Sequence, residues 1–163
     1  MHKNLYFHVA LFHDTILEIK NLLSDEFKYF PTGSCGSTCL LLGTYLNESG
    51  FGKFKYISGE KYFWDGYSNQ EYSHSWLESE DSLIIDITAY QFPEIKEKIL
   101  VQKKNSWYKD WAITQTFDDV NIFHETYAIP TDKINYEIII SNIKSKNKIE
   151  NFTLRQAQAP RQF

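Results

Sequence analysis

Apolar residues recur at steps of three and four along residues 10–28, with polar residues between them. This spacing places the apolar side chains on one face of a helix. The pattern therefore predicts an amphipathic helix over residues 10–28. We expect it to end at the Phe30-Pro31 break, because a residue before proline disfavours helical backbone. The apolar positions are Phe12, Ile16, Ile19, Leu23 and Phe27.

A second helical pattern follows a predicted turn at residues 32–35 and ends near Gly50. It is apolar around most of its circumference, which is typical of a helix that is buried on all sides. We therefore expect this helix at the centre of the fold. Its apolar residues are Cys39, Leu40, Leu41, Leu42, Tyr45 and Leu46.

The pattern then changes to the alternation of a β-sheet. Residues 54–60 alternate between apolar and polar and predict a strand. Residues 64–69 are rich in turn formers and aromatic residues. Two further strands are predicted over residues 72–78 and 83–88, joined by a short turn.

The last two strands place a histidine and an aspartate at matching distances from their turn. His74 lies six residues before Glu80, and Asp86 lies six residues after it. An antiparallel hairpin with an odd loop centred on Glu80 would put His74 directly opposite Asp86, on the same face. We therefore expect the two side chains to meet.

The C-terminal half has weaker patterns. Residues 91–101 are ambiguous, with a possible helix start at Glu94 after Pro93. Residues 105–129 carry many aromatic side chains without a period, and the sequence assigns them no element. Residues 136–143 suit a strand or a helix equally well.

These elements predict one α+β domain over residues 1–150. Helices, including a buried helix that carries Cys35, would pack on an antiparallel sheet. Residues 151–163 lack an apolar pattern and predict a flexible C-terminal tail.

Composition narrows the function classes. A chain of 163 residues can bury one sizeable core. The net charge of −4 disfavours a protein that binds nucleic acid by neutralising phosphates. No apolar segment is long enough to span a bilayer, and the N-terminus is a poor signal peptide. We expect a cytoplasmic protein without a membrane partner, or one exported without a cleavable signal.

The cysteines and histidines predict neither a disulfide nor a metal site. Cys35 and Cys39 are four residues apart, so on one helix their side chains point in the same direction and do not pair. A structural zinc site would need a second pair of ligands. The remaining histidines have no metal-ligand spacing, and no cofactor is expected; they are His2, His8, His13 and His124.

Cys35 is the candidate nucleophile. It lies at the predicted start of the buried helix, where unpaired N–H groups and the helix dipole stabilise a thiolate. Gly33 and Gly36 flank it and let the backbone approach a substrate closely. The alternative is that Cys35 is a small structural residue in a helix-entry turn.

His74 and Asp86 are the candidate base and its orienting carboxylate. Asp86 lies between Ile85 and Ile87 in an otherwise apolar strand, where a buried carboxylate needs a partner. A carboxylate opposite the ring selects its tautomer and stabilises its charged form. The alternative is a half-buried strand histidine beside a surface carboxylate.

With these residues in this order, the chain resembles the transglutaminase-like branch of the papain-like cysteine hydrolases. The resemblance covers roughly residues 30–92 and rests on three segments: Gly33-Ser34-Cys35-Gly36, His74-Ser75-Trp76-Leu77-Glu78 and Ile85-Asp86-Ile87-Thr88. Papain-type enzymes instead have an aromatic residue after the nucleophile and a histidine far downstream. Here the cysteine and the histidine are 39 positions apart, and no glutamine precedes Cys35 to act as an oxyanion donor. The backbone N–H of Cys35, with Tyr29 or Gln91, would take that role.

The resemblance implies a thiol-dependent hydrolase or acyltransferase that acts on a peptide, a protein or another amide or ester. Cys35, His74 and Asp86 would form its triad. The substrate cleft would be lined by aromatic residues, namely Trp64, Tyr67, Tyr72 and Trp76. Two alternatives remain, a non-catalytic domain of this fold that binds a peptide or glycan and a bacterial effector or toxin with the same chemistry. No oligomeric state is predicted.

Overall fold

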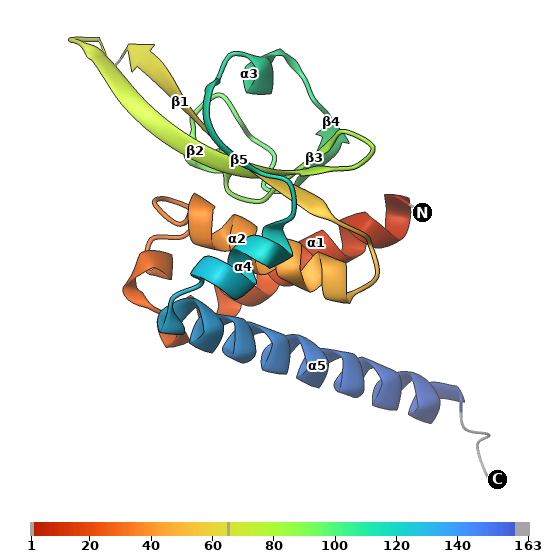
Figure 1. The fold of residues 1–163 in the computed structure, drawn as a ribbon. Coiled ribbons are helices and arrows are strands. Elements are labelled where there is room, and N and C mark those ends of the chain that lie inside the picture. Colours follow the sequence, from red (N-terminus) through yellow and green to blue (C-terminus); the bar gives the residue numbers. More distant parts are fainter. Residues whose placement is uncertain (1, 65, 159–163) are drawn as a thin grey trace, which may run out of the picture.

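Helices and an antiparallel sheet form two layers in the computed structural model, which describes residues 2–64 and 66–158 (Figure 1). The helices are α1 (His2–Ile19), α2 (Cys35–Glu48), α3 (Ser106–Lys109), α4 (Val120–Tyr127) and α5 (Pro130–Gln158). The strands are β1 (Phe54–Trp64), β2 (Asn69–Ser79), β3 (Leu83–Asp86), β4 (Leu100–Lys103) and β5 (Ala112–Phe117). The strands form one sheet in the order β4-β3-β2-β1-β5, with every neighbouring pair antiparallel. The predicted α+β class is confirmed.

The sheet separates two apolar cores. On one side, α2 and α4 pack against the sheet, and α1 and α5 pack on α2, which lies in the middle (Figure 1). On the other side, α3 and the loops around it cover a second core that is rich in aromatic rings. Side chains alternate along a strand, so Leu77 of β2 faces the first core while His74 and Trp76 lie on the second face.

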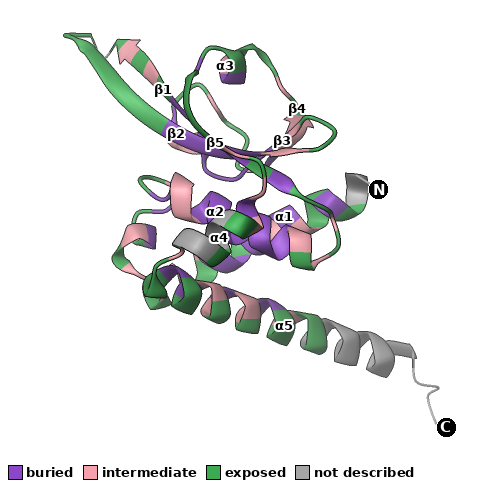
Figure 2. Cartoon of the chain, viewed as in Figure 1, coloured by how far each residue is buried: buried purple, intermediate pink, exposed green. Residues whose placement is uncertain are grey.

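The central position predicted for the second helix is confirmed. Residues 38–46 of α2 are buried without a break, and the visible turns of α2 are mainly purple in Figure 2. Gly43 lets α4 approach closely, because a Cβ there would overlap the side chain of Val120. The apolar side chains around α2 are therefore covered on all sides, by the other helices and by the sheet.

The first helix differs from its predicted bounds. α1 begins at His2 and ends at Ile19, and two short 3₁₀ turns follow at Lys20–Leu22 and Asp25–Phe27. At Ser24 the backbone N–H donates to Asn135 Oδ1 on α5 at 3.0 Å. This tertiary bond holds the chain outside the helix, although Phe27 still reaches the core.

The hairpin of β2 and β3 has a different register from the predicted one. Leu77 pairs with Ile85 and Glu78 with Ile84, so the loop is centred on Asp81 rather than Glu80. Ser82 adopts a positive φ of 59°, as in three-residue hairpin loops that end in a left-handed residue. His74 and Asp86 therefore lie diagonally across the hairpin rather than directly opposite. Since the shift is two residues, they still share a face.

The C-terminal half is more ordered than its sequence pattern indicates. Residues 136–143 are helical within α5, which extends to Gln158. The sequence predicts a flexible tail from residue 151, whereas residues 151–158 are helical; Arg, Gln and Ala favour a helix even without an apolar stripe. Residues 159–163 lie outside the described part. No helix begins at Glu94, and β4 starts at Leu100 instead.

We find no helix among the described residues that is both long and apolar enough to cross a bilayer.

Candidate active site

Cys35 is the first residue of α2 and is half-buried. The preceding Ser34 donates its hydroxyl to the carbonyl of Pro31 at 3.1 Å and makes no capping bond to the helix. The first-turn N–H groups, which have no intrahelical acceptor, are therefore left to stabilise an anion at this end. Gly33 has a φ of 77°, a left-handed value that favours glycine in the turn that leads into α2.

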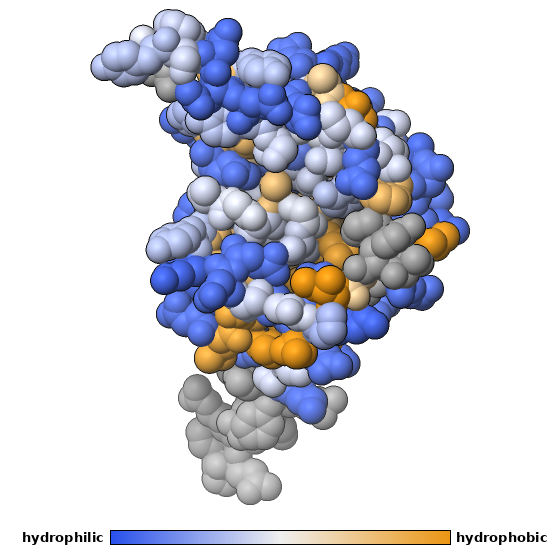
Figure 3. All heavy atoms as spheres, turned by 60° about the vertical axis from the view of Figure 1, so that its left-hand side comes forward, coloured by the Kyte–Doolittle hydropathy of each residue, from blue (hydrophilic) through white to orange (hydrophobic). Residues whose placement is uncertain are grey.

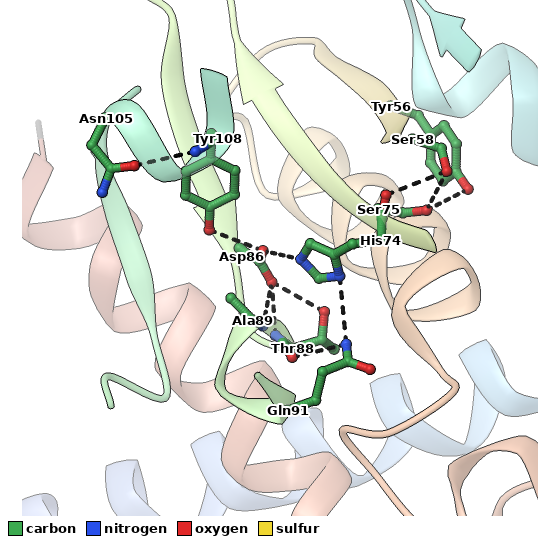
Figure 4. A network of polar contacts seen from close by, with 10 residues as sticks. All are labelled: Tyr56, Ser58, His74, Ser75, Asp86, Thr88, Ala89, Gln91, Asn105 and Tyr108. Atoms are coloured by element: carbon green, nitrogen blue, oxygen red, sulfur yellow. Dashed lines mark hydrogen bonds and ion pairs between the residues drawn. The ribbon is translucent and has the colours of Figure 1, made fainter. Parts of the chain in front are cut away.

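His74 and Asp86 form a buried hydrogen-bonded pair (Figure 4). His74 Nε2 lies 2.6 Å from Asp86 Oδ2, and neither side chain is exposed. A carboxylate accepts, so Nε2 carries a proton in both the neutral and the charged ring, and Nδ1 is left for a second partner. The predicted pairing of these two residues is confirmed, even though the register that was expected to bring them together is wrong.

The carboxylate of Asp86 accepts four further hydrogen bonds. Oδ1 accepts from the backbone N–H groups of Thr88 at 2.8 Å and Ala89 at 3.0 Å, and from the Thr88 hydroxyl at 3.0 Å. Oδ2 also accepts from the Tyr108 hydroxyl at 3.0 Å. This full set of donors compensates for the burial of the charge.

Tyr108 is a residue of the site that the sequence did not reveal. It lies on α3, and the backbone N–H of Tyr108 donates to the Asn105 side chain at 3.4 Å (Figure 4). The only signal in the sequence is indirect, since a buried carboxylate such as Asp86 requires donors from elsewhere in the chain. The aromatic stretch around Tyr108 has no period that would point it toward Asp86.

The three candidate residues shift one another's pKa in the sense expected of a triad. Burial alone would raise the pKa of the Cys35 thiol, but the hydrogen bond and charge of His74, with the Ser75 backbone N–H, lower it below its usual range. Burial alone would lower the pKa of His74, but the charge and hydrogen bond of Asp86, with a contribution from Cys35, raise it to about 9. The pKa of Asp86 is lowered, because His74 and the other donors outweigh the effect of burial.

Aromatic rings enclose the imidazole. The ring centroids of four aromatic side chains lie 5.2 to 6.0 Å from that of His74. They are Phe92, Trp111, Trp107 and Trp76. Enclosure by apolar groups strengthens the interaction of His74 with Asp86 and excludes water from it.

The aromatic residues that the sequence predicts to line the cleft differ in where the structure places them relative to His74. Tyr72 is exposed and packs on Phe92, which in turn contacts His74. Trp76 is 0% exposed and packs beside His74 in the second core, so the structure does not place its ring on an open cleft.

Trp64 and Tyr67 lie at the far end of the hairpin. Trp64 pairs with Asn69, five residues beyond His74 along β2, or about 16 Å at the usual rise per residue. Tyr67 is 92% exposed in the turn. The structure therefore does not bring either residue to the triad.

Of the two side chains predicted as oxyanion donors, one lies beside His74 and the other does not. Gln91 Nε2 lies 3.4 Å from His74 Nδ1 and donates to the Thr88 carbonyl at 3.0 Å (Figure 4). Tyr29 is 71% exposed, with Lys28 over its ring. Gln91, and not Tyr29, is thus placed beside the nitrogen that serves the thiol.

The remaining histidines whose side chains are described have other partners. His8 Nδ1 contacts the Tyr45 hydroxyl at 2.7 Å, and His13 lies between Asp14 and Tyr90. Over the part of the chain that the structure describes, no group of three or more His, Cys, Asp or Glu side chains is arranged to hold a metal ion.

Tyr108→Phe is expected to destabilise the protein by about 2 kcal/mol at neutral pH, since it removes a buried hydrogen bond to a charged group. Asp86 has a lowered pKa in the folded state, so the stability that its ionisation provides is lost as pH falls through that pKa. The difference between the wild type and the variant should therefore shrink in acid. Urea unfolding at a series of pH values measures it.

Tyr62→Phe is the matched control for this measurement. It deletes the same group from a pair with Glu71 that is exposed to solvent, where no measurable change in stability is expected. Equal effects of the two substitutions would contradict the role assigned to Tyr108.

Cys39→Ala is expected to reduce stability by about 1 kcal/mol and to leave the chemistry of Cys35 intact. Cys39 is buried one turn further along α2, and burial raises the pKa of its thiol well above the usual range. Alkylation of the native protein should therefore modify Cys35 alone, as peptide mapping by mass spectrometry would show. A similar loss of reactivity in folded Cys39→Ala and Cys35→Ala proteins would contradict this division.

Cys35 and Cys39 are both free thiols. Comparisons of the chain with known protein families, with curated proteins and with solved structures find no match.

Proposed function

We propose that this protein is a cysteine-dependent acyl-transfer enzyme, with Cys35 as nucleophile, His74 as general base and acid, and Asp86 as the residue that orients His74. The observation that carries the proposal is the buried pair of His74 Nε2 and Asp86 Oδ2 at 2.6 Å, which leaves Nδ1 for the thiol at the start of α2. A surface histidine or a structural cysteine would need neither the five hydrogen bonds to Asp86 nor the mutual pKa shifts.

The chemistry follows from the positions of the protons. The Cys35 thiolate attacks a substrate carbonyl, an S–C bond forms, and the π electrons move to the oxygen. That oxygen accepts from the backbone N–H of Cys35, and Gln91 Nε2 is the candidate second donor. The C–N or C–O bond then breaks, and the leaving group takes the proton from His74 Nδ1.

The second half of the reaction releases the acyl group. Neutral Nδ1 removes a proton from the acceptor, which attacks the thioester and expels the Cys35 thiolate. Water as acceptor gives a peptidase, amidase or deamidase, and an amine gives a transglutaminase-like product. The order of Cys35, His74 and Asp86 on helix, strand and strand supports the transglutaminase-like, papain-like assignment for this site.

The test uses an activated ester, because it needs no knowledge of the natural substrate. We expect p-nitrophenyl acetate to release about one equivalent of nitrophenolate in a burst, followed by slower turnover. Mass spectrometry of the quenched protein should locate the acetyl group on Cys35. An acetyl group found only on lysines would contradict the proposal.

A further inference from the structure

The edge of β2 that faces away from β1 is free along most of its length. β2 pairs with β1 from Asn69 to Ser79, but with β3 only at Leu77 and Glu78. Over the described residues, no other backbone partner joins the segment 69–75. Residues 69–73 are exposed, and the hairpin that carries them projects beyond the helices (Figure 1).

The free edge presents the backbone groups of odd-numbered residues. The carbonyl of His74 accepts from Ser58 Oγ of β1 at 3.3 Å, so the polar backbone groups of His74 face β1. Since these groups alternate along an antiparallel strand, those of Ser73 and Ser75 face the free edge. The same holds for Glu71.

The nucleophile lies on this line of groups. The backbone of Ser75 lies close enough to the Cys35 thiol to help lower its pKa. The first turn of α2 lies near Ser75 as well, since the Tyr56 hydroxyl is 2.9 Å from Ser75 Oγ and 3.4 Å from the position that a Cβ on Gly36 would take. Figure 4 shows Tyr56, Ser58 and Ser75 grouped on the two strands. A substrate carbonyl at the Cys35 sulfur would therefore lie in line with the free edge of β2.

The edge lacks the usual protection against pairing with another chain. Exposed edges are commonly blocked by lysine, proline or a bulge, and residues 69–73 contain neither lysine nor proline. The projecting hairpin, at the top of Figure 3, is mainly blue and pale rather than orange. Recognition at this edge would therefore depend on backbone hydrogen bonds more than on an apolar patch.

We propose that an extended polypeptide segment pairs with the free edge of β2 along residues 71–73 and places one of its carbonyls at Cys35. This proposal rests on the proposed function and gives its substrate class as an extended polypeptide rather than a small amide. A substrate side chain about three residues from the reacting carbonyl would lie beside Tyr72 and Phe92, which share the face of His74. An apolar residue is preferred there.

The test compares peptide electrophiles of increasing length. N-acetyl-oligoalanyl chloromethyl ketones with one to four alanines alkylate a thiolate, which forms a thioether and releases chloride. We expect the second-order rate at Cys35 to rise about tenfold or more from the shortest to the longest, as edge hydrogen bonds are added. N-methylation of the inner amides should remove that gain, because it deletes donors without changing the side chains.

Ser73→Pro provides the matching change in the protein. Proline is tolerated where the N–H faces a free edge, and it removes one donor to the peptide. It should flatten the length series, while Ser73→Ala, which keeps the N–H, should not. The N-methyl series on the wild type keeps the test decisive if the proline variant folds poorly.

The outcomes separate this proposal from the proposed function. A flat length series together with fast alkylation of Cys35 by iodoacetamide would overturn pairing at the edge and leave the nucleophile in place. Slow alkylation by both reagents would overturn the proposed function itself. A dimer in solution that Ser73→Pro dissociates would assign the edge to a second copy of the chain and overturn the substrate proposal.

Discussion

Cys35→Ala is expected to abolish the nitrophenolate burst and to slow acylation by at least about a thousandfold, because no other group in the site can form the acyl intermediate. The substitution removes one half-buried sulfur at the start of α2 and leaves the buried residues of that helix in place. Folding should therefore be close to that of the wild type, and circular dichroism checks this.

Cys39→Ala is the matched control, since it deletes the same atom four residues along the same helix. We expect it to retain a full burst. A burst that survives in Cys35→Ala at wild-type amplitude would leave Cys35 as a structural cysteine. The site would then be better explained as a binding domain that retains the fold.

Alkylation of Cys35 by iodoacetamide is expected to stay fast well below the pKa of about 8.5 of a free thiol. The pKa of Cys35 is lowered because the hydrogen bond and charge of His74 outweigh the effect of burial. His74→Gln removes the positive charge beside the sulfur, so its rate profile should move up to that of an ordinary cysteine. Rates measured from pH 5 to pH 10 test this.

Asp86→Asn should produce a smaller shift in the same direction. It keeps a side chain that can accept from Thr88 and Ala89 but lacks the charge that raises the pKa of His74. A wild-type profile that rises only near the free-thiol pKa, and that neither substitution alters, would contradict the thiolate–imidazolium pair. The wild-type curve alone decides this if a variant folds poorly.

Turnover should fall again at high pH, unlike alkylation. The leaving group needs the proton on His74 Nδ1, and the pKa of His74 is raised to about 9. A group with a raised folded-state pKa also contributes stability that is complete below its unfolded value near 6.5 and is lost as pH rises through 9. Activity and stability should thus decline together on the alkaline side.

The sequence predicted those parts of the site that depend on local patterns. The apolar circumference of residues 39–46 marked the buried helix, and the turn before it placed Cys35 at its start. His74 and Asp86 were placed on one face because parity along a strand survives a register error of two residues. The exact register depended on the left-handed Ser82, which no periodicity reveals.

The remaining errors concern long-range contacts. Tyr108 reaches Asp86 only because α3 folds over the second face of the sheet, and its stretch has no period that would indicate this. The sequence predicts that Trp76 lines the cleft, because its side chain lies on the same face of β2 as that of His74. That face is covered by the second core, so Trp76 is buried. Burial by a distant segment cannot be read from local spacing.

The two cores on either side of the sheet divide the candidate machinery between them. The thiol belongs to α2 in the helical layer, whereas aromatic rings of the second core enclose His74, and Tyr108 of that core donates to Asp86. The His74–Asp86 bond can therefore survive a small slide of one layer over the other, while the distance from Nδ1 to the sulfur cannot. The alkylation rate of Cys35 therefore reports how well the two layers are packed together. On heating, this rate should fall before the secondary structure is lost.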